Sequence, residues 1–501
     1  MPLRKLRWPL VWLLGWLLLG SGATGFGAPR ITEFQTSNEA GLADADGDFP
    51  DWIEIHNPDG VPVSLAGYSL TDAPTNPQKW VFPAVTLPAG GYLVVFASGK
   101  DRSDPAGPLH TDFQLSSTGE YLALLGPDGV TAVSAFAPGY PPQLPGESFG
   151  IDPTAAAPGW AYFRVPTPGA PNGNGRRAGP VIQPMALNPP APTTGPLTIA
   201  VKVLPTNDAV GTVRLFYRRM FAAETGAGMV DDGTGGDAVA DDGIWSATIP
   251  AAALAPGEMT RWRVVASDRV GVNTTAPAYH DPLDADQYYG TVAQDPALQT
   301  ALPVLHWFTT NVARAGTTAG ARGAVYYDGE FYDNVLFTVH GQSSAGFPKK
   351  SYNLDFNRGH HFQWSTNAPR VADIDLLSNW ADKSKVRHVL AYEVMRRSGV
   401  AAHFAYTVRV QHNGAFFSTA DLVEDADETY LERAGLNPDG ALYKVYANTL
   451  NKDAGNTGNS GVEKKTRRSE NNNDLQELIN GLDLTGPALE RYLYDHVDIP
   501  A

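Results

Sequence analysis

The sequence contains no cysteine, and charged residues make up only 18% of its 501 positions. The absence of cysteine excludes a disulfide scaffold, thiolate zinc sites, iron–sulfur clusters and cysteine nucleophiles. Basic residues are also scarce, because 37 Lys and Arg stand against 53 Asp and Glu and give a net charge of −16. A general nucleic-acid-binding protein is normally basic, so we expect no nucleic-acid partner.

Glycine and proline are abundant instead, with 51 and 40 residues. Together they exceed average usage of about 12% but stay below the roughly 25–30% that marks low-complexity disorder. This excess indicates many turns and therefore short strands rather than long helices. The hydrophobic content of 43% is sufficient for buried cores, and a chain of this length has room for about two to five domains.

Residues 1–28 have the pattern of a secretory signal peptide. A positive start with Arg4, Lys5 and Arg7 precedes the apolar run 11–19, and small residues follow as far as Ala28. The apolar run is short for a membrane span, although a retained N-terminal anchor is the alternative. No later stretch is apolar enough to cross a membrane. We therefore expect a protein that is secreted or at the cell surface, without a membrane span after cleavage.

Residues 29–165 alternate short apolar strands with turn residues, a pattern typical of an antiparallel β-sandwich. Within them, residues 46–57 read DGDFPDWIEIHN, residues 63–72 read VSLAGYSLTD and residues 79–83 read KWVFP. These motifs resemble the lamin-tail domain of the bacterial secreted kind. The resemblance implies an immunoglobulin-like sandwich and does not imply an enzyme.

The remaining chain divides by composition into a linker and two further units. Residues 166–192 are rich in Pro, Gly and Asn and indicate a linker. Residues 193–292 show alternating strands, and they resemble an immunoglobulin- or fibronectin-type sandwich. Residues 293–301 connect this unit to residues 302–501, where strands precede helical patterns and an α+β unit is expected. The whole fold class is therefore multidomain, with two all-β sandwiches followed by an α+β unit.

The third unit contains a strand, a small-residue loop and a second strand between positions 338 and 356. A Gly/Ser loop between strands can present backbone N–H groups to phosphate oxygens, and a lysine on the next strand can reach the phosphates. Lys350 alternates with the apolar residues of the second strand, so we expect it on the buried face, in need of an anion. Two surface lysines on an edge strand are the alternative.

The helical pattern over residues 384–397 offers a partner for that lysine. Glu393 falls within the apolar stripe of the helix, and a carboxylate on a buried face needs a counter-charge. We therefore predict a Glu393–Lys350 pair. A local Glu393–Arg397 pair at i,i+4 is the alternative, which would contribute only a few tenths of a kcal/mol.

Together these residues resemble the CotH kinase family of secreted or spore-coat relatives of protein kinases. The matching blocks are QSS at 342–344, PKKSY at 348–352, LLSN at 376–379, Asn413-Gly414, LVE at 422–424 and LYK at 442–444. The resemblance implies a kinase-like fold over 302–501, ATP with Mg²⁺ or Mn²⁺, and phosphorylation of Ser or Thr in envelope, coat or matrix proteins. The resemblance implies that Glu424 lies near the nucleotide, in the hinge between the two lobes of a kinase. It also implies that Arg387 either has a structural role or faces a phosphate. The implied cofactor-binding residues are Gln342, Ser343, Ser344, Lys350, Arg387, Glu393 and Glu424.

The sequence departs from that family because the Asn-x-Asp and Trp-Asp-x-Asp stretches expected after the helix at 487–495 do not occur. Phosphoryl transfer needs carboxylates to hold metal and a residue to orient the hydroxyl. We therefore expect this sequence to be an incomplete and inactive piece of the kinase, with no catalytic residue within it. The alternative function is a non-catalytic surface attachment or scaffold protein.

Two acidic loops are candidates for calcium. The first contains Asp44, Asp46 and Asp48, and the second contains Asp231, Asp237 and Asp241. The glycine and glutamate positions do not match an EF-hand. A non-EF calcium site and a solvated acidic turn both remain open for each loop.

Overall fold

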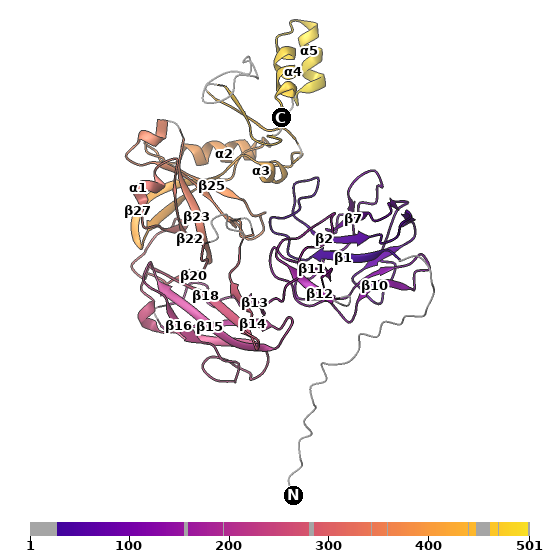
Figure 1. Ribbon diagram of the computed structural model, residues 1–501. Coiled ribbons are helices and arrows are strands. Elements are labelled where there is room, and N and C mark those ends of the chain that lie inside the picture. Colours follow the sequence, from indigo (N-terminus) through magenta and orange to yellow (C-terminus); the bar gives the residue numbers. More distant parts are fainter. Residues whose placement is uncertain are drawn as a thin grey trace.

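The computed structural model describes residues 28–154, 159–193, 195–279, 285–341, 343–357, 359–438, 440–446, 461–468 and 470–498. All but the last residue of the predicted signal peptide at 1–28 lies outside this range. Strands account for 37% of the structure and helices for 11%, so the protein is multidomain and mostly β (Figure 1). Within the described residues, the helices are too short or too polar to span a membrane.

The first unit is an immunoglobulin-like sandwich of two sheets, antiparallel except for the parallel pair of β7 with β8. Its apolar residues alternate with polar ones and meet between the sheets, where Phe34, Ile53 and Leu124 are fully buried. The larger sheet contains, in spatial order, β12 (Gly159–Phe163), β11 (Ser148–Asp152), β1 (Arg30–Gln35), β2 (Asp51–His56), β7 (Tyr92–Ala97) and β8 (Leu109–His110). The smaller sheet contains β10 (Ala132–Phe136), β9 (Leu122–Leu125), β4 (Ser69–Thr71) and β5 (Trp80–Val81), while β3 (Val63–Ser64) pairs with β6 (Thr86–Leu87).

The stretch interpreted as a linker at 166–192 is fixed to the folded units at both ends. Thr167 donates its backbone N–H to the buried carboxylate of Glu33, and Gly169 donates to that of Glu54 at 2.8 Å. Further along, β13 (Val181–Pro184) pairs with a strand of the second unit. The composition of this stretch indicated its turns correctly, but composition alone does not reveal such tertiary hydrogen bonds.

The second unit is also a β-sandwich. One sheet contains β13, β14 (Leu197–Leu204) and β17 (Ile244–Ile249), followed by the short 3₁₀ turn η1 (Ala251–Ala253). The other contains β16 (Thr225–Gly228), β15 (Val210–Arg219), β18 (Met259–Asp268) and β19 (Asn273–Ala276), with β20 (Tyr289–Val292) paired to β18.

The third unit, expected to be α+β, is built on a closed barrel with short helices around it. Its strands follow the order β21 (Val304–Phe308), β22 (Ala321–Tyr327), β23 (Glu330–His340), β24 (Ser351–Asp355), β25 (Asp373–Leu377), β27 (Ala415–Glu424) and β26 (Ala405–His412). The parallel pairing of β26 with β21 closes the barrel. The described helices around it are α1 (Val312–Ala315), the 3₁₀ turn η2 (Ser343–Gly346), α2 (Arg387–Arg397) and α3 (Glu428–Arg433).

The interior of the barrel is apolar, because Trp307, Phe337, Leu354 and Leu422 fill it. A separate buried cluster that includes Met259, Phe308 and Phe331 joins the second sandwich to the outside of the barrel. Arg261 and Asp333, both buried, add a contact at 3.3 Å across the same boundary. The second sandwich and the barrel therefore share a packed interface.

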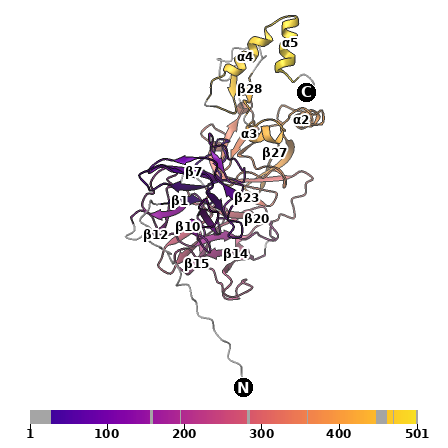
Figure 2. The ribbon, with the colours of Figure 1, turned by 90° about the vertical axis from the view of Figure 1, so that its right-hand side faces the viewer.

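The last part of the chain forms a small unit that projects from the barrel in both views (Figure 1, Figure 2). It contains the strand pair β28 (Tyr443–Val445) and β29 (Val462–Lys464), followed by α4 (Asn473–Leu482) and α5 (Pro487–His496). A small core of Val462, Leu475 and Ile479 holds the strand pair against α4.

Candidate functional site

The predicted pair between Lys350 and Glu393 does not form, which corrects the expectation from sequence. The Lys350 ammonium donates instead to the backbone carbonyl of Gly316 at 2.8 Å. The Glu393 carboxylate accepts from Arg397 at 2.6 Å and from Arg396 at 2.9 Å, as in the local alternative.

The reason is the orientation of α2. His388 and Tyr392 lie on the side of this helix that is turned toward the barrel, as their interactions with Asp421 and Asp375 indicate. The apolar stripe is exposed, since Leu390 and Val394 are 56% and 63% accessible. Glu393 lies on the same side of α2 as this stripe, so its carboxylate does not contact the barrel strands.

The other residues of the predicted nucleotide site are dispersed. Gln342 lies outside the described residues, and Ser343 is part of η2. The hydroxyl of Ser344 donates to the carbonyl of His340 at 3.1 Å. The Arg387 side chain is 77% exposed and lies 3.4 Å from Asp382.

Glu424, at the end of β27, is buried among protein groups. It accepts the backbone N–H of Phe404 at 2.9 Å, and two guanidinium nitrogens of Arg433, Nε and Nη2, each donate to one of its oxygens. Burial raises the pKa of Glu424, while Arg433 opposes that shift. This carboxylate therefore has a structural role, since its hydrogen-bonding capacity is engaged within the protein.

The outer face of the barrel beneath α2 carries a different set of polar side chains. Register pairs Asn353 of β24 with Asp375 of β25, so both side chains lie on the same face. Asp375 is buried and accepts from Asn353 at 3.2 Å and from His340 Nδ1 at 2.9 Å. This contact is the main cause that raises the pKa of His340. A buried carboxylate on the outside of a barrel thus receives its partners from two neighbouring strands.

A second buried carboxylate, Asp421 of β27, lies on the same outer face. It accepts from Thr407 of β26 at 3.0 Å and approaches His388 Nδ1 of α2 at 3.6 Å. This proximity raises the pKa of His388. His388 therefore connects α2 electrostatically to the barrel.

Lys349 is the lysine that joins this polar face. Its ammonium donates to the side-chain carbonyl of Asn379, whose backbone carbonyl accepts from Lys385 at 2.7 Å. Burial and the nearby charge of Lys385 lower the pKa of Lys349, and Asp421 opposes that effect. Two ammonium groups held around one asparagine, beside buried carboxylates, form an arrangement suited to a phosphate group.

Sequence reasoning missed this set although a signal was present. Lys349 alternates with Ser351 and Asn353 along one face, while Lys350 alternates with the apolar face. That alternation favoured Lys350 as the buried lysine. However, β24 begins at Ser351, so both lysines precede the strand, and strand alternation determines the direction of neither side chain.

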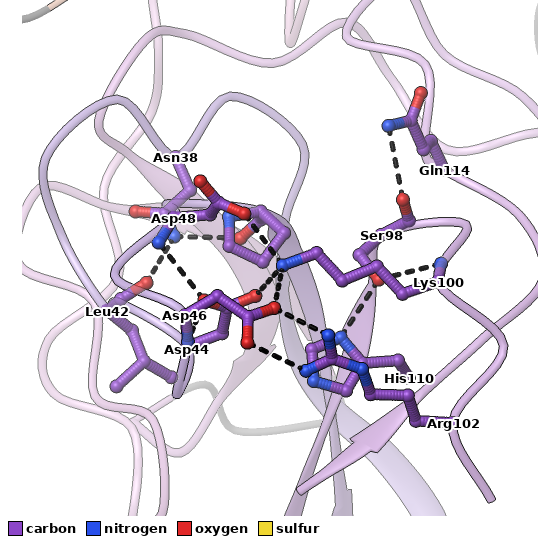
Figure 3. A network of polar contacts seen from close by, with 11 residues as sticks. Asn38, Leu42, Asp44, Asp46, Asp48, Ser98, Lys100, Arg102, His110 and Gln114 are labelled. Atoms are coloured by element: carbon purple, nitrogen blue, oxygen red, sulfur yellow. Dashed lines mark hydrogen bonds and ion pairs between the residues drawn. The ribbon is translucent and has the colours of Figure 1, made fainter. Parts of the chain in front are cut away.

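The first predicted calcium loop forms an ion cluster with a protein cation (Figure 3). The carboxylates of Asp44, Asp46 and Asp48 lie within 4.8 Å of one another. The Lys100 ammonium contacts all three of them at 2.5–2.7 Å, and Arg102 also pairs with Asp46. Arg102 and Lys100 lower the pKa of Asp46 to about 2. Lys100 thus lies where a bound cation would lie.

The second predicted calcium loop brings together a slightly different set of residues. The carboxylates of Asp231, Asp237 and Asp242 lie within 4.8 Å of one another, whereas the predicted Asp241 is not part of that group. Asp241 has a positive φ of 61°, and its backbone N–H donates to the carbonyl of Asp231. The calcium prediction for this loop stays a prediction.

Comparison with known proteins supports the organisation of the chain. The family model of the Lamin Tail Domain matches residues 24–138, and that of the CotH kinase protein matches residues 337–501. No curated protein matches.

One solved structure with a detectable similarity is the purple acid phosphatase PPD1 from yellow lupin (Lupinus luteus) seeds. It shares 12% identity over 56% of this chain and 44% of its own, with a TM-score of 0.22. A TM-score this low supports no conclusion about fold or function. The two family matches, in their order along the chain, identify a lamin tail domain followed by a CotH kinase domain.

Proposed function

We propose that this protein is an exported CotH-type kinase that transfers phosphate from ATP to Ser or Thr residues of envelope, coat or matrix proteins. The family match over residues 337–501 supports the reaction class. The pattern of residues 1–28 supports export. The two β-sandwiches would hold the kinase at a surface or against a partner protein.

The observation that carries the proposal is the half-buried Lys349 on the polar face beneath α2. Burial and, after it, the nearby charge of Lys385 lower the pKa of Lys349, and the ammonium groups of both lysines donate to Asn379. An anion bound between the two ammonium groups would remove their repulsion. The donor set therefore fits the phosphate groups of a nucleotide better than the predicted residues Lys350 and Glu393 do.

Lys349 and Lys385 would hold the phosphates, and Asn379 would keep both ammonium groups in place. ATP, when bound, supplies the phosphoryl group, and the Mg²⁺ or Mn²⁺ suggested by the family neutralises its charge. Asp421 is the carboxylate best suited to accompany that metal, because it is buried and acts electrostatically on Lys349. His388 would keep α2 against this face through Asp421.

The reaction is tested by incubating the protein with γ-labelled ATP, Mn²⁺ or Mg²⁺ and a library of Ser- and Thr-containing peptides. Labelled peptide that disappears in Lys349→Met but persists in Lys350→Met would support the kinase. Nucleotide binding without transfer would agree with the absence of the Asn-x-Asp and Trp-Asp-x-Asp stretches from this sequence, whereas the alternative of a non-catalytic attachment or scaffold protein predicts no nucleotide binding. If the protein shows no nucleotide binding and no transfer, a nucleotide site on this face is contradicted.

A further inference from the structure

A cavity of about 490 Å³ lies where the second sandwich meets the outside of the barrel. The sandwich lines it with Val292 and Ala293, and the barrel lines it with His306 of β21 and Tyr326 of β22. Residues of the segment 293–301, which connects the two units, close a further side. Cavities of about 300–1,000 Å³ at domain interfaces are typical small-molecule sites, so this one has room for a small organic ligand.

His306 gives the cavity a hydrogen-bond donor. It lies between Leu305 and Trp307, which face the interior of the barrel, so its side chain points outward. Its Nδ1 atom is enclosed without a hydrogen-bond partner among the described residues, which leaves Nε2 as the nitrogen that faces the cavity. Burial lowers the pKa of His306 to about 4, and the charge of Asp295 opposes that shift, so the ring is neutral at neutral pH. A buried N–H without an acceptor is rarer than a buried acceptor without a donor, and the single ring proton therefore belongs on Nε2.

Two hydrogen-bond acceptors of the connecting segment line the same cavity. The half-buried Asp295 accepts the backbone N–H of Ala297 through Oδ1 at 3.0 Å, and its Oδ2 accepts no hydrogen bond from the described residues. The side-chain amide of Gln294 donates to the carbonyl of Ala191 at 2.9 Å, which leaves its Oε1 as an acceptor. The rest of the wall is mostly apolar and includes Val292, Leu298, Val304 and Tyr326.

We propose that this cavity binds a single sugar residue. Each sugar hydroxyl both donates and accepts, so neighbouring hydroxyls of one pyranose ring can donate to Asp295 and Gln294 and accept from His306. The C–H face of the ring would lie against the apolar wall and release water from it. An amine would satisfy Asp295 but would leave the N–H of His306 without an acceptor.

The cavity is separate from the polar face beneath α2, because its barrel strands are β21 and β22 rather than β24, β25 and β27. The inference therefore goes beyond the proposed kinase activity, and it does not depend on nucleotide binding. A sugar bound here would contact the second sandwich, the connecting segment and the barrel at once. Such a ligand stabilises the interface between these parts by mass action.

Saturation-transfer NMR of the full chain tests the site with free glucose, galactose, mannose and N-acetylglucosamine in turn. We expect transfer to the ring protons of at least one sugar, because the contacts involve ring hydroxyls and C–H groups that these sugars share. Leu298→Trp places a larger side chain in the cavity and should abolish the transfer. Leu302→Trp is the matched control, since Leu302 is 36% exposed and lies outside the lining of the cavity. Asp295→Asn keeps the acceptor for Ala297 but loses the charge, so the dissociation constant should rise about fivefold.

The tripeptide Ala-Pro-Ala is the comparison ligand, because a peptide also combines donors, acceptors and apolar groups. Circular dichroism of each variant verifies that the protein remains folded. Failure of all four sugars to bind would overturn the proposal. Transfer that persists unchanged in Leu298→Trp would also overturn it, because the sugar would then bind elsewhere. Binding of the tripeptide without binding of any sugar would show a peptide site instead. Loss of kinase activity would leave these results unaffected, because the assay contains no nucleotide.

Discussion

Replacement of Lys100 by methionine tests the ion cluster of the lamin tail domain. Methionine keeps much of the aliphatic volume but removes the ammonium group from Asp44, Asp46 and Asp48. The Asp44 side chain is fully buried, the Asp48 side chain is 65% exposed and the Lys100 side chain is 25% exposed. The substitution therefore leaves one buried carboxylate without its cation, while the exposed one can be solvated by water.

The expected loss of stability lies between two known cases. Breaking an exposed ion pair costs about 0–1 kcal/mol, and removing one partner of a fully buried pair costs about 3–5 kcal/mol. Lys100 is mostly covered, but Asp44 also accepts backbone N–H groups from Asp46 and Asp48 at 2.9 and 3.0 Å. We therefore expect a loss of about 2–3 kcal/mol in the first sandwich.

Hydrogen exchange is a suitable assay, because a chain with several folded units does not unfold in one step. The slowest amides of β2 and β7 report the global opening of the first sandwich. A loss of about 2–3 kcal/mol makes their exchange about 30- to 150-fold faster. Lys79→Met is the matched control, since Lys79 forms a single pair with Asp72 at 2.7 Å in the same unit.

Lys100→Met should accelerate amide exchange in β2 and β7 clearly more than Lys79→Met does. Calcium should restore part of the lost protection in Lys100→Met, because three carboxylates within 4.8 Å are then free to bind it. If the two substitutions accelerate amide exchange equally, the stability of the cluster does not depend on Lys100. A large calcium response in the unmodified protein would show that Lys100 does not occupy the place of the cation.

Three further predictions concern other buried or surface charges. Arg433→Met should destabilise the barrel by about 3–5 kcal/mol because Glu424 loses its buried partner, and the double change with Glu424→Gln should recover part of that loss in urea unfolding. Burial raises the pKa of Glu39 to about 7. The contribution of Glu39 to stability is therefore present below about pH 4 and is lost as pH rises through about 7. Glu39→Gln should raise the melting temperature at pH 8 but not at pH 4. Glu393→Ala should leave the urea unfolding curve unchanged, because the ion pairs of Glu393 are local and exposed, and a clear shift of the midpoint would indicate a tertiary partner.

Strand positions were predictable because alternation of apolar and polar residues reports directly on a two-sided strand. Short strands were expected within residues 29–165, where β2 and its neighbours form, and the helix expected at 487–495 forms α5 with one more residue. Closure of the barrel was not predictable, because it depends on a parallel pairing between β21 and β26, which are about a hundred residues apart. Local periodicity contains no information about such a pairing.

The error about α2 has a specific physical cause. The prediction assumed that an apolar stripe faces the core, which holds when the surface beneath a helix is apolar. Here the barrel presents Asp375 and Asp421 to α2, so the helix meets it with His388 and Tyr392. The choice of Lys350 over Lys349 relied on strand alternation, which applies to neither lysine because β24 begins at Ser351.

The most direct test of the proposed site is the affinity for ATP of Lys349→Met compared with Lys350→Met, measured at equilibrium with Mg²⁺ present. Loss of a charge-assisted contact of about 1.5–3 kcal/mol predicts a dissociation constant about 10- to 150-fold higher for Lys349→Met. Lys350→Met should bind as the unmodified protein does, because Lys350 donates to the carbonyl of Gly316 away from the polar face. The opposite order, with Lys350→Met losing affinity and Lys349→Met retaining it, would contradict the site beneath α2.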